Sequence, residues 1–424
     1  MNSRERVRVA ISHQVPDRIP LDLDGTAVTG ISAAAYGDLR RVLGLEPKPV
    51  RVWEPFQMLG DVDLDVKEAL GVDVVGLERL MTPFGFPNLN WKPWRQFHDI
   101  ELLVSEYFVT SETENGDILI HPGGDKAASP SGRMPKGGFY FDAIVRQEPI
   151  DWDRLDPEKW VKDTFFVYPD FYLEYLQREA DSLYRNTTFS LTGFALGGGF
   201  GDIAAVPAPG SKRPRGIRNP EDWYMAHSAR PEYIKGIFEL QCDIALKNLK
   251  LYKEAVGDKI DVMFVSGTDF GSQRGPILSP KMYRDLYKPY QKKVNDWIHS
   301  NTTWKTFYHS CGSVAALLDD FIEAGVDILN PVQTSAEGMD PVMLKEKYGD
   351  KLVFWGGGVD TQRVLPFGTP DEVKEDVKRR LELFGRGGGF VFAAIHNIQH
   401  GTPPANLHAL FETVKELRER SSVP

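Results

Sequence analysis

Cysteine is scarce in this chain, which has only two, Cys242 and Cys311, among its 424 residues. Two cysteines cannot form the disulfide framework of a small secreted protein, so the composition indicates a reducing compartment and a cytoplasmic protein. Cys242 lies in the apolar helical pattern 238–246, which is typical of a protein core. Any cysteine chemistry in this protein is therefore expected at Cys311.

Long hydrophobic runs are also missing. No segment approaches the roughly 20 apolar residues that a membrane-spanning helix needs, and residues 1–7 have no apolar signal core. Basic residues are fewer than acidic ones: the chain has 50 Lys and Arg residues and 60 Asp and Glu residues, which gives a formal net charge of -10. Nucleic-acid binding depends on clustered basic side chains, and the short basic run 211–216 does not supply such a cluster. These absences argue against a membrane protein and against a nucleic-acid-binding protein.

Apolar runs that suit buried strands alternate with helical patterns along most of the chain. Eight such runs are predicted as strands, at 17–24, 72–77, 189–193, 261–266, 304–308, 327–330, 352–355 and 390–394. Their Val, Ile, Phe and Leu content is typical of parallel strands that are covered on both faces. Alternating units of this kind form either an open doubly wound sheet or a closed barrel, and a count of eight favours an α/β fold of the (β/α)8 TIM-barrel type. We therefore expect one barrel domain over residues 1–424.

The region 80–186 interrupts this alternation with prolines and clustered aromatic residues. It contains a hairpin signal, Asn115-Gly116, between two alternating runs, which predicts a two-residue turn. A helical pattern follows at 169–185. We expect an inserted antiparallel and helical segment after the second strand, and we expect this insertion to shape the mouth of the barrel.

His309 and Cys311 stand one residue apart at the end of the fifth predicted strand. Side chains at i and i+2 of an extended segment point to the same side. His396 closes the eighth predicted strand, and strand ends in a barrel gather around one mouth. Imidazole and thiolate are zinc ligands, and a catalytic zinc site keeps a fourth position for substrate or water. The pattern predicts a zinc site, although a histidine in an apolar strand is also commonly a hydrogen-bonded core residue.

Other polar residues end or follow the predicted strands. Asp22 and Asp24, two residues apart, are predicted to share one face at the end of the first strand, and Asp269 lies between two glycines after the fourth. These carboxylates could accept protons or hydrogen-bond a ligating histidine, or could simply cap turns. Candidates for substrate binding are Asn330 and Gln333 after the sixth strand, and Gly193 and Phe194 at the start of a glycine-rich turn after the third.

Several of these segments together resemble the uroporphyrinogen decarboxylase superfamily, and within it the zinc-dependent, corrinoid-linked methyltransferase branch. The resemblance is carried by the segments 17–20, 269–280, 309–312, 324–333, 354–360, 388–397 and 403–406. It implies an eight-stranded α/β barrel. In the methyltransferase members zinc is bound by a His-x-Cys pair and a later cysteine, which corresponds here to His309, Cys311 and, at the later position, His396.

Two further absences bear on the chemistry that this resemblance implies. The chain lacks the N-terminal arginine run with which decarboxylase members hold a tetrapyrrole, so porphyrinogen decarboxylation is the less favoured reaction. It also lacks the Asp-x-His-x-x-Gly motif of cobalamin-binding proteins. A corrinoid (cobalamin) cofactor would therefore have to be carried by a separate partner protein that docks at the barrel mouth.

The resulting hypothesis is a zinc-dependent methyltransferase that moves a methyl group from a small methylated donor to a partner's corrinoid. The aromatic-rich insertion and the single thiolate favour O-demethylation of a methoxylated aromatic compound. One alternative is a decarboxylase that acts on an organic acid or a porphyrinogen-like substrate. Another is a barrel without catalytic activity that binds a ligand or a corrinoid protein. A homodimer is one candidate assembly, but the sequence does not determine it.

Overall fold

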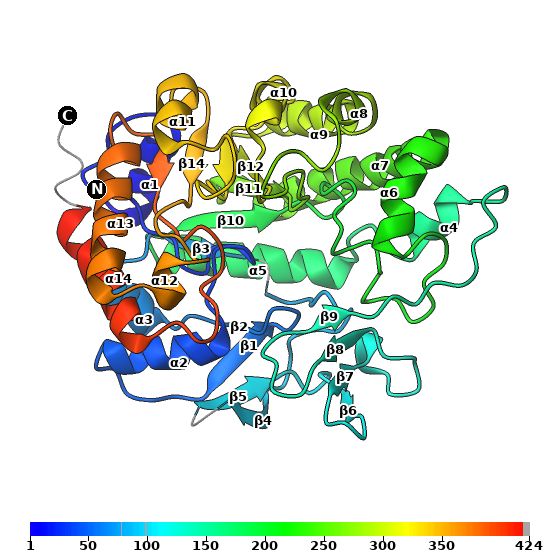
Figure 1. Ribbon diagram of the computed structural model, residues 1–424, viewed down its shortest axis with the longest axis horizontal. Coiled ribbons are helices and arrows are strands. Elements are labelled where there is room, and N and C mark those ends of the chain that lie inside the picture. Colours follow the sequence, from blue (N-terminus) through cyan, green and yellow to red (C-terminus); the bar gives the residue numbers. More distant parts are fainter. Residues whose placement is uncertain (78, 98–99, 419–424) are drawn as a thin grey trace.

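A parallel sheet forms the centre of the computed structural model, which describes residues 1–77, 79–97 and 100–418 (Figure 1). Its strands are β3 (Val74–Gly76), β10 (Ser190–Phe194), β11 (Val262–Ser266), β12 (Lys305–His309), β13 (Ile328–Asn330), β14 (Val353–Trp355) and β15 (Phe390–Val391). They follow one another in the order β15-β14-β13-β12-β11-β10-β3, and every neighbouring pair is parallel. Each strand falls within or next to a predicted run.

The segment around Leu21 closes this sheet into a barrel. Leu21 forms a parallel bridge with Phe392, next to β15. On its other side the amide of Asp73, next to β3, donates to the Leu21 carbonyl at 2.8 Å. The segment therefore takes the place of the first of eight strands, and the predicted (β/α)8 barrel is confirmed. Its regular pairing is shorter than the predicted run because Pro20 has no N–H group to donate to the ladder.

The barrel interior is apolar, and helix α1 (Ser3–Ile11) closes its N-terminal end. Its buried side chains are Val7, Ala10 and Ile11 of α1 and, from the strands, Val74, Val262, Phe264, Phe307, Ile328, Val353, Trp355, Val391 and Ala393. The helix is attached to the starts of two strands, since the Arg4 amide donates to the Thr188 carbonyl and the Gly389 amide donates to the Ala10 carbonyl. In Figure 1 the arrow of β10 points away from α1. The opposite, C-terminal ends of the strands form the mouth.

Helices surround the barrel and cover the outer faces of its strands (Figure 1). They are α2 (Ala33–Val42), α3 (Leu64–Leu70), α5 (Asp170–Asn186), α6 (Pro220–Ala229), α7 (Pro231–Val256), α8 (Pro280–Leu286), α9 (Lys288–Asn301), η2 (Ala315–Leu317), α10 (Leu318–Glu323), α11 (Pro341–Tyr348), α12 (Val364–Phe367), α13 (Pro370–Phe384) and α14 (Pro404–Leu417). Several begin with an N-cap side chain followed by proline, as at Asn219 and Thr369. Among the described helices, none combines the length and the apolar composition that a bilayer crossing requires.

Two smaller sheets lie beside the barrel, at the lower edge of Figure 1. The first has the order β2-β1-β5-β4, and the second β6-β7-β8-β9. Their strands are β1 (Val50–Glu54), β2 (Leu59–Gly60), β4 (Lys92–Phe97), β5 (Ile100–Val104), β6 (Thr110–Glu112), β7 (Ile118–Ile120), β8 (Gly132–Met134) and β9 (Asp142–Ala143), with the short helices η1 (Pro122–Gly124) and α4 (Pro157–Lys162) nearby. Strand β1 was not predicted from the sequence.

The predicted hairpin is present as β6 and β7, which pair antiparallel. Its turn is longer than the predicted two residues, because the Thr113 amide donates to the Asp117 carbonyl and leaves three residues between them, with Gly116 at φ +86°. Helix α5, predicted as part of the insertion, packs on α7 and β10. It connects β3 to β10 and so serves as a crossover helix of the barrel. Residues 98–99, inside the predicted insertion, and 419–424, at the end of the predicted domain, lie outside the described residues.

Candidate functional site

The structure brings His309, Cys311 and His396 together at the barrel mouth. One donor atom from each lies within 4.8 Å of the others. The sulfur of Cys311 is 3.3 Å from Nε2 of His309, and the two imidazole rings are 5.5 Å apart between centroids. His309 is the last residue of β12, Cys311 stands two residues later, and His396 follows β15. Closure of the barrel places the two strand ends close enough for all three side chains to face one point.

Asn330 determines which nitrogen of His309 faces the cluster. The Asn330 side-chain amide nitrogen donates to the carbonyl of Trp355 at 2.7 Å. Its oxygen must therefore face His309, where Nδ1 donates to it at 2.6 Å. Nε2 is then left without a proton and directs a lone pair toward Cys311. An imidazole held in this way through its second nitrogen is the usual arrangement of a metal-ligating histidine.

The protonation states of the cluster also suit a metal. Burial lowers the pKa of His309, and burial together with His309 lowers the pKa of His396 to about 3. Both imidazoles are neutral at pH 7, which is the form that binds a metal. Burial and the neighbouring Asp269 raise the pKa of the Cys311 thiol well above its ordinary value. A bound dication would supply the positive charge that a buried thiolate needs, so this donor set fits zinc.

Asp269 and Gln333 hold the backbone that carries Cys311. The Cys311 amide donates to Oδ1 of Asp269 at 2.6 Å, and the same oxygen is 3.9 Å from Nε2 of His309. The Gly312 amide donates to the side-chain oxygen of Gln333 at 2.7 Å. The side-chain nitrogen of Gln333 is buried and has no hydrogen-bond partner within the described part of the chain. These predicted residues therefore lie at the cluster, and Gln333 retains an unused donor.

Asp22 and Asp24 lie in different environments. Asp22 is buried and accepts hydrogen bonds from the Trp355 indole and the Gly25 amide, both at 2.8 Å. Burial raises the pKa of Asp22 to about 6. Asp24 instead accepts from the Trp53 indole at 3.0 Å and pairs with Arg79 at 3.0 Å. The prediction that both carboxylates share one strand face is wrong, because Asp24 has a left-handed backbone (φ +79°), which ends the alternation.

Gly193 and Phe194 also separate. A Cβ atom on Gly193 would lie 2.5 Å from the hydroxyl oxygen of Tyr252 in α7, so this position faces outward. The glycine is explained by close helix packing, and Gly193 does not contact the cluster. Phe194 is 36% exposed at the end of β10 and stacks on Phe264, with 5.6 Å between ring centroids. Of the two residues, only Phe194 offers an aromatic face at the rim.

Two carboxylates that the sequence interpretation missed carry strongly perturbed pKa values. Asp202 follows the glycine-rich turn after β10, and burial together with the charge of Asp269 raises its pKa to about 7. Glu54 ends β1, accepts from the amides of Phe56 and Gln57, and has its pKa raised by burial to about 7. The position of Asp202 after a barrel strand is a signal that could have identified it. Glu54 had no such signal, because β1 itself was not predicted.

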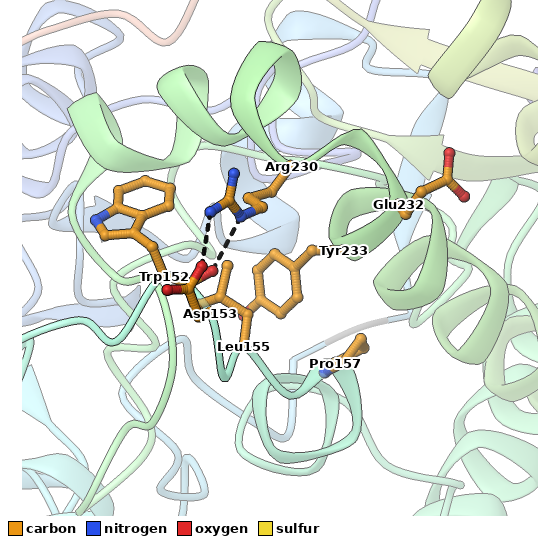
Figure 2. A pocket seen from close by; sticks show the side chains of 7 residues that line it. All are labelled: Trp152, Asp153, Leu155, Pro157, Arg230, Glu232 and Tyr233. Atoms are coloured by element: carbon orange, nitrogen blue, oxygen red, sulfur yellow. Dashed lines mark hydrogen bonds and ion pairs between the residues drawn. The ribbon is translucent and has the colours of Figure 1, made fainter.

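A surface pocket elsewhere contains none of these residues. Figure 2 shows its lining side chains, among them Trp152, Asp153, Arg230 and Tyr233. The Arg230 guanidinium is bound to Asp153 at 3.1 Å and is not available as a free anion-binding group. His400, four residues after His396, stacks on Phe139. Neither feature competes with the cluster at the mouth.

Comparisons with known proteins agree with this fold. Residues 216–417 match the family model of uroporphyrinogen decarboxylase (URO-D). A uroporphyrinogen decarboxylase from Synechococcus sp. (strain JA-3-3Ab) is 23% identical over 287 residues, which cover 66% of this chain and 72% of that protein. Another, from Parasynechococcus marenigrum (strain WH8102), is 29% identical over 194 residues, or 44% of this chain and 52% of that protein.

The comparison with solved structures extends over nearly the whole chain. A methyltransferase from Methanosarcina mazei superposes with a TM-score of 0.54 at 15% identity, covering 98% of this chain and 99% of that chain. The matched region 216–417 includes Asp269, His309, Cys311 and His396. Fold, sequence match and the position of the cluster at the strand ends agree with one another: residues 216–417 are similar to uroporphyrinogen decarboxylase, and the chain shares the fold of the Methanosarcina mazei methyltransferase.

Proposed function

We propose that this protein is a zinc-dependent methyltransferase that transfers a methyl group from a small methylated donor to a corrinoid carried by a partner protein. The observation that carries the proposal is the cluster of two neutral imidazoles and one thiol at the barrel mouth. The full-length similarity to a protein titled as a methyltransferase supports the kind of reaction. Zinc would be held by His309, Cys311 and His396.

The composition of the cluster favours a weakly reactive donor. One thiolate and two neutral imidazoles leave a zinc ion with a formal charge of +1, so it remains a stronger Lewis acid than in a site with two thiolates. When bound, it would polarise the heteroatom of the donor and stabilise charge on the leaving group. A methyl ether has a poor leaving group and needs that assistance. We therefore propose a methoxylated aromatic compound as the donor.

The chain's own residues would position this donor. Asn330 fixes the orientation of His309, and Asp269 fixes the backbone of Cys311. The unused side-chain nitrogen of Gln333 is a donor for a polar substituent of the substrate. Phe194, stacked on Phe264 at the rim, offers an aromatic surface against which an aromatic ring could pack.

A second candidate is a decarboxylase of an organic acid, because the family model and the curated relatives carry that name. It would release carbon dioxide without a corrinoid partner. Within the described residues, Asp22 and Asp202 form no ion pair with lysine or arginine, so they bring no cation that would hold a substrate carboxylate. We therefore place this reaction second.

Metal content tests the proposal directly. Elemental analysis of the purified protein should give about one zinc ion per chain. His309→Ala and Cys311→Ser should each lose the zinc, whereas Cys242→Ala should keep it, because Cys242 is buried in α7, in the helix layer outside the barrel. A protein without stoichiometric zinc, or one whose zinc content is unaffected by the two cluster variants, would contradict the proposal. A screen of methoxy compounds with the corrinoid partner, followed by cobalamin absorbance, then identifies the donor.

A further inference from the structure

We propose that Asp202 is the proton donor to the oxygen atom that leaves when the methyl donor is cleaved. This inference rests on the proposed function, because it concerns the same site, and it narrows the donor class. Donors whose leaving group departs as an anion, such as ethers, need a proton. Quaternary ammonium and sulfonium donors release a neutral amine or thioether, which needs no proton.

Contacts between neighbouring loops bring Asp202 close to Asp269, which itself lies beside the cluster. The hydroxyl of Thr268, after β11, donates to the Phe200 carbonyl at 2.8 Å, two residues before Asp202. Gly267 lies against Asp202, because a Cβ atom at this position would be 3.2 Å from its Oδ2. Asp269, which accepts from the Cys311 amide, follows two residues after Gly267. The loops after β10, β11 and β12 thus connect Asp202 to the candidate zinc ligand.

The carboxyl group of Asp202 has one oxygen that is not used by the fold. Oδ1 accepts from the Ala204 amide at 3.0 Å. Oδ2 has no hydrogen-bond or ion-pair partner among the residues that the structure describes. It faces Gly267, which has no side chain to fill the space in front of it. This oxygen is therefore available to a substrate, whereas the carboxylate of Asp24 is occupied by Trp53, Val62 and Arg79.

The charged and titratable groups around Asp202 favour a proton donor. Asp269 raises the pKa of Asp202 together with burial, and the resulting value of about 7 leaves acid and carboxylate both populated at neutral pH. Tyr224, on α6, interacts with both members of this pair, and Asp269 also interacts with His309 and Cys311. The pKa of Tyr224 is raised by burial, by Asp269 and by Asp202. No lysine or arginine forms an ion pair with Asp202 within the described residues.

The proposed step balances as an ether cleavage. The bond between methyl carbon and oxygen breaks, and its electron pair stays on the oxygen. The reduced corrinoid of the partner, as methyl acceptor, supplies the electron pair of the new carbon–cobalt bond and is oxidised by two electrons. Asp202 gives its proton to the oxygen, so the product leaves as a phenol, and the carboxylate recovers a proton from water.

The first test measures the proton on Asp202 without requiring methyl transfer. Infrared difference spectra between the zinc-loaded wild type and Asp202→Asn should show a protonated carboxyl band that disappears as the pH rises through about 7. The control pair, wild type and Asp285→Asn, should show no such band, because Asp285 is exposed on α8 and paired with Lys281. An Asp202 that is ionised at every pH from well below to well above neutrality would overturn the proposal.

The second test uses the dependence on the leaving group. For methyl ethers of weakly acidic phenols, Asp202→Asn should lower the rate by about 10²–10⁴-fold, the usual contribution of a general acid. For ethers of strongly acidic nitrophenols the loss should be small, with zinc content unchanged. An equal loss for all donors, or no loss, would contradict the proposal. If the wild type transfers methyl groups from no donor, the proposed function fails, and the infrared result still decides the protonation of Asp202.

Discussion

At the N-terminal end of the barrel the buried carboxylate of Asp73 is surrounded by arginine, whereas at the mouth the carboxyls of Asp22 and Asp202 form no ion pair within the described residues. Arg6 binds Asp73 at 2.6 Å, and Arg18 and Arg418 approach it to 3.6 and 3.7 Å. The Ser3 hydroxyl and the Leu21 amide complete its shell. Burial instead raises the pKa of Asp22 and Asp202.

This difference separates stability from chemistry. Charges that are paired at the closed end attach α1, the first strand and the chain's last helix to one another. A buried carboxyl without a cation tends to hold its proton, which makes it a poor structural anchor and a useful proton donor. The two ends of one barrel therefore place residues of the same type in opposite environments, which agrees with the proposal that the mouth carries the active site.

Among the changes that test this contrast, His396→Ala at the mouth is expected to have the largest effect, on zinc binding and on methyl transfer. Loss of a direct ligand should weaken zinc binding by more than about 100-fold, beyond what loss of a supporting residue does, and reduce methyl transfer to background. The metal-free protein should stay about as stable as the wild type, because the change removes a partly buried, neutral imidazole that forms no ion pair within the described residues. Zinc titration and urea unfolding check the two parts. If the metal-free variant were unfolded, the idea that mouth residues contribute to chemistry and not to stability would be contradicted.

At the closed end, Asp73→Ala should have the opposite effect. It removes the buried carboxylate that Arg6 and Arg418 share, although Arg6 keeps its ion pair with Asp17, so the free energy of unfolding should fall by about 1–3 kcal/mol. The folded fraction should still bind one zinc ion per chain. Urea unfolding and zinc stoichiometry measure both quantities. A variant of normal stability, or one that loses zinc while folded, would break the comparison between the two ends.

Much of the barrel could be predicted because a buried parallel strand needs a continuous apolar run. Such runs located β3 and β10 to β15, and the spacing of His309 and Cys311 placed two donors on one side. Strand β1 was not predicted because it does not belong to the strand–helix units of the barrel. It pairs with β5, in the distant segment 100–104. The barrel's regular alternation carries no information about such an added sheet.

The candidate site was less predictable wherever the direction of a side chain depended on tertiary contacts. Gly193 faces α7 because side chains alternate between the two sides of a strand and this position falls on the outer side. Asp24 leaves the strand face because its own backbone is left-handed. Asp202 lies eight residues after the end of β10, and its place beside Asp269 depends on tertiary contacts such as the hydrogen bond between Thr268 and the Phe200 carbonyl. Residue type and spacing therefore indicated which three donors meet at the mouth, and also the neighbouring Asp269, Asn330 and Gln333, but not Asp202.

A smaller effect is expected from Asn330→Leu, which keeps the volume of a side chain that orients a proposed ligand. Without its oxygen, Nδ1 of His309 has no acceptor, and the ring can adopt the wrong tautomer. Zinc affinity should fall by about 10–100-fold, the usual effect of losing such a supporting group. Competition with a chelator measures this change. An unchanged affinity would show that the hydrogen bond does not orient the ligand.

The smallest effect is a dependence of stability on pH that has opposite signs at the two ends. Because the pKa of Asp202 is raised to about 7 from 3.8, the folded state holds a proton that the unfolded state has lost between these values. Stability of the metal-free protein therefore falls as the pH rises across that interval. At the closed end, bonds from Arg6 and the N-terminal amine outweigh burial and lower the pKa of Asp17, so its contribution is lost as the pH falls below the ordinary range. Asp202→Asn keeps an oxygen for the Ala204 amide and should remove the contribution of Asp202 to the first dependence, while those of Asp22 and Glu54 remain. Above neutral pH the free energy of unfolding of this variant should exceed that of the wild type by about 1 kcal/mol, a figure reduced for solvent screening, and this gain should vanish in mild acid.

Urea unfolding across the pH range measures the difference. A gain that persists in acid would mean that Asp202 acts on stability through packing and not through its charge.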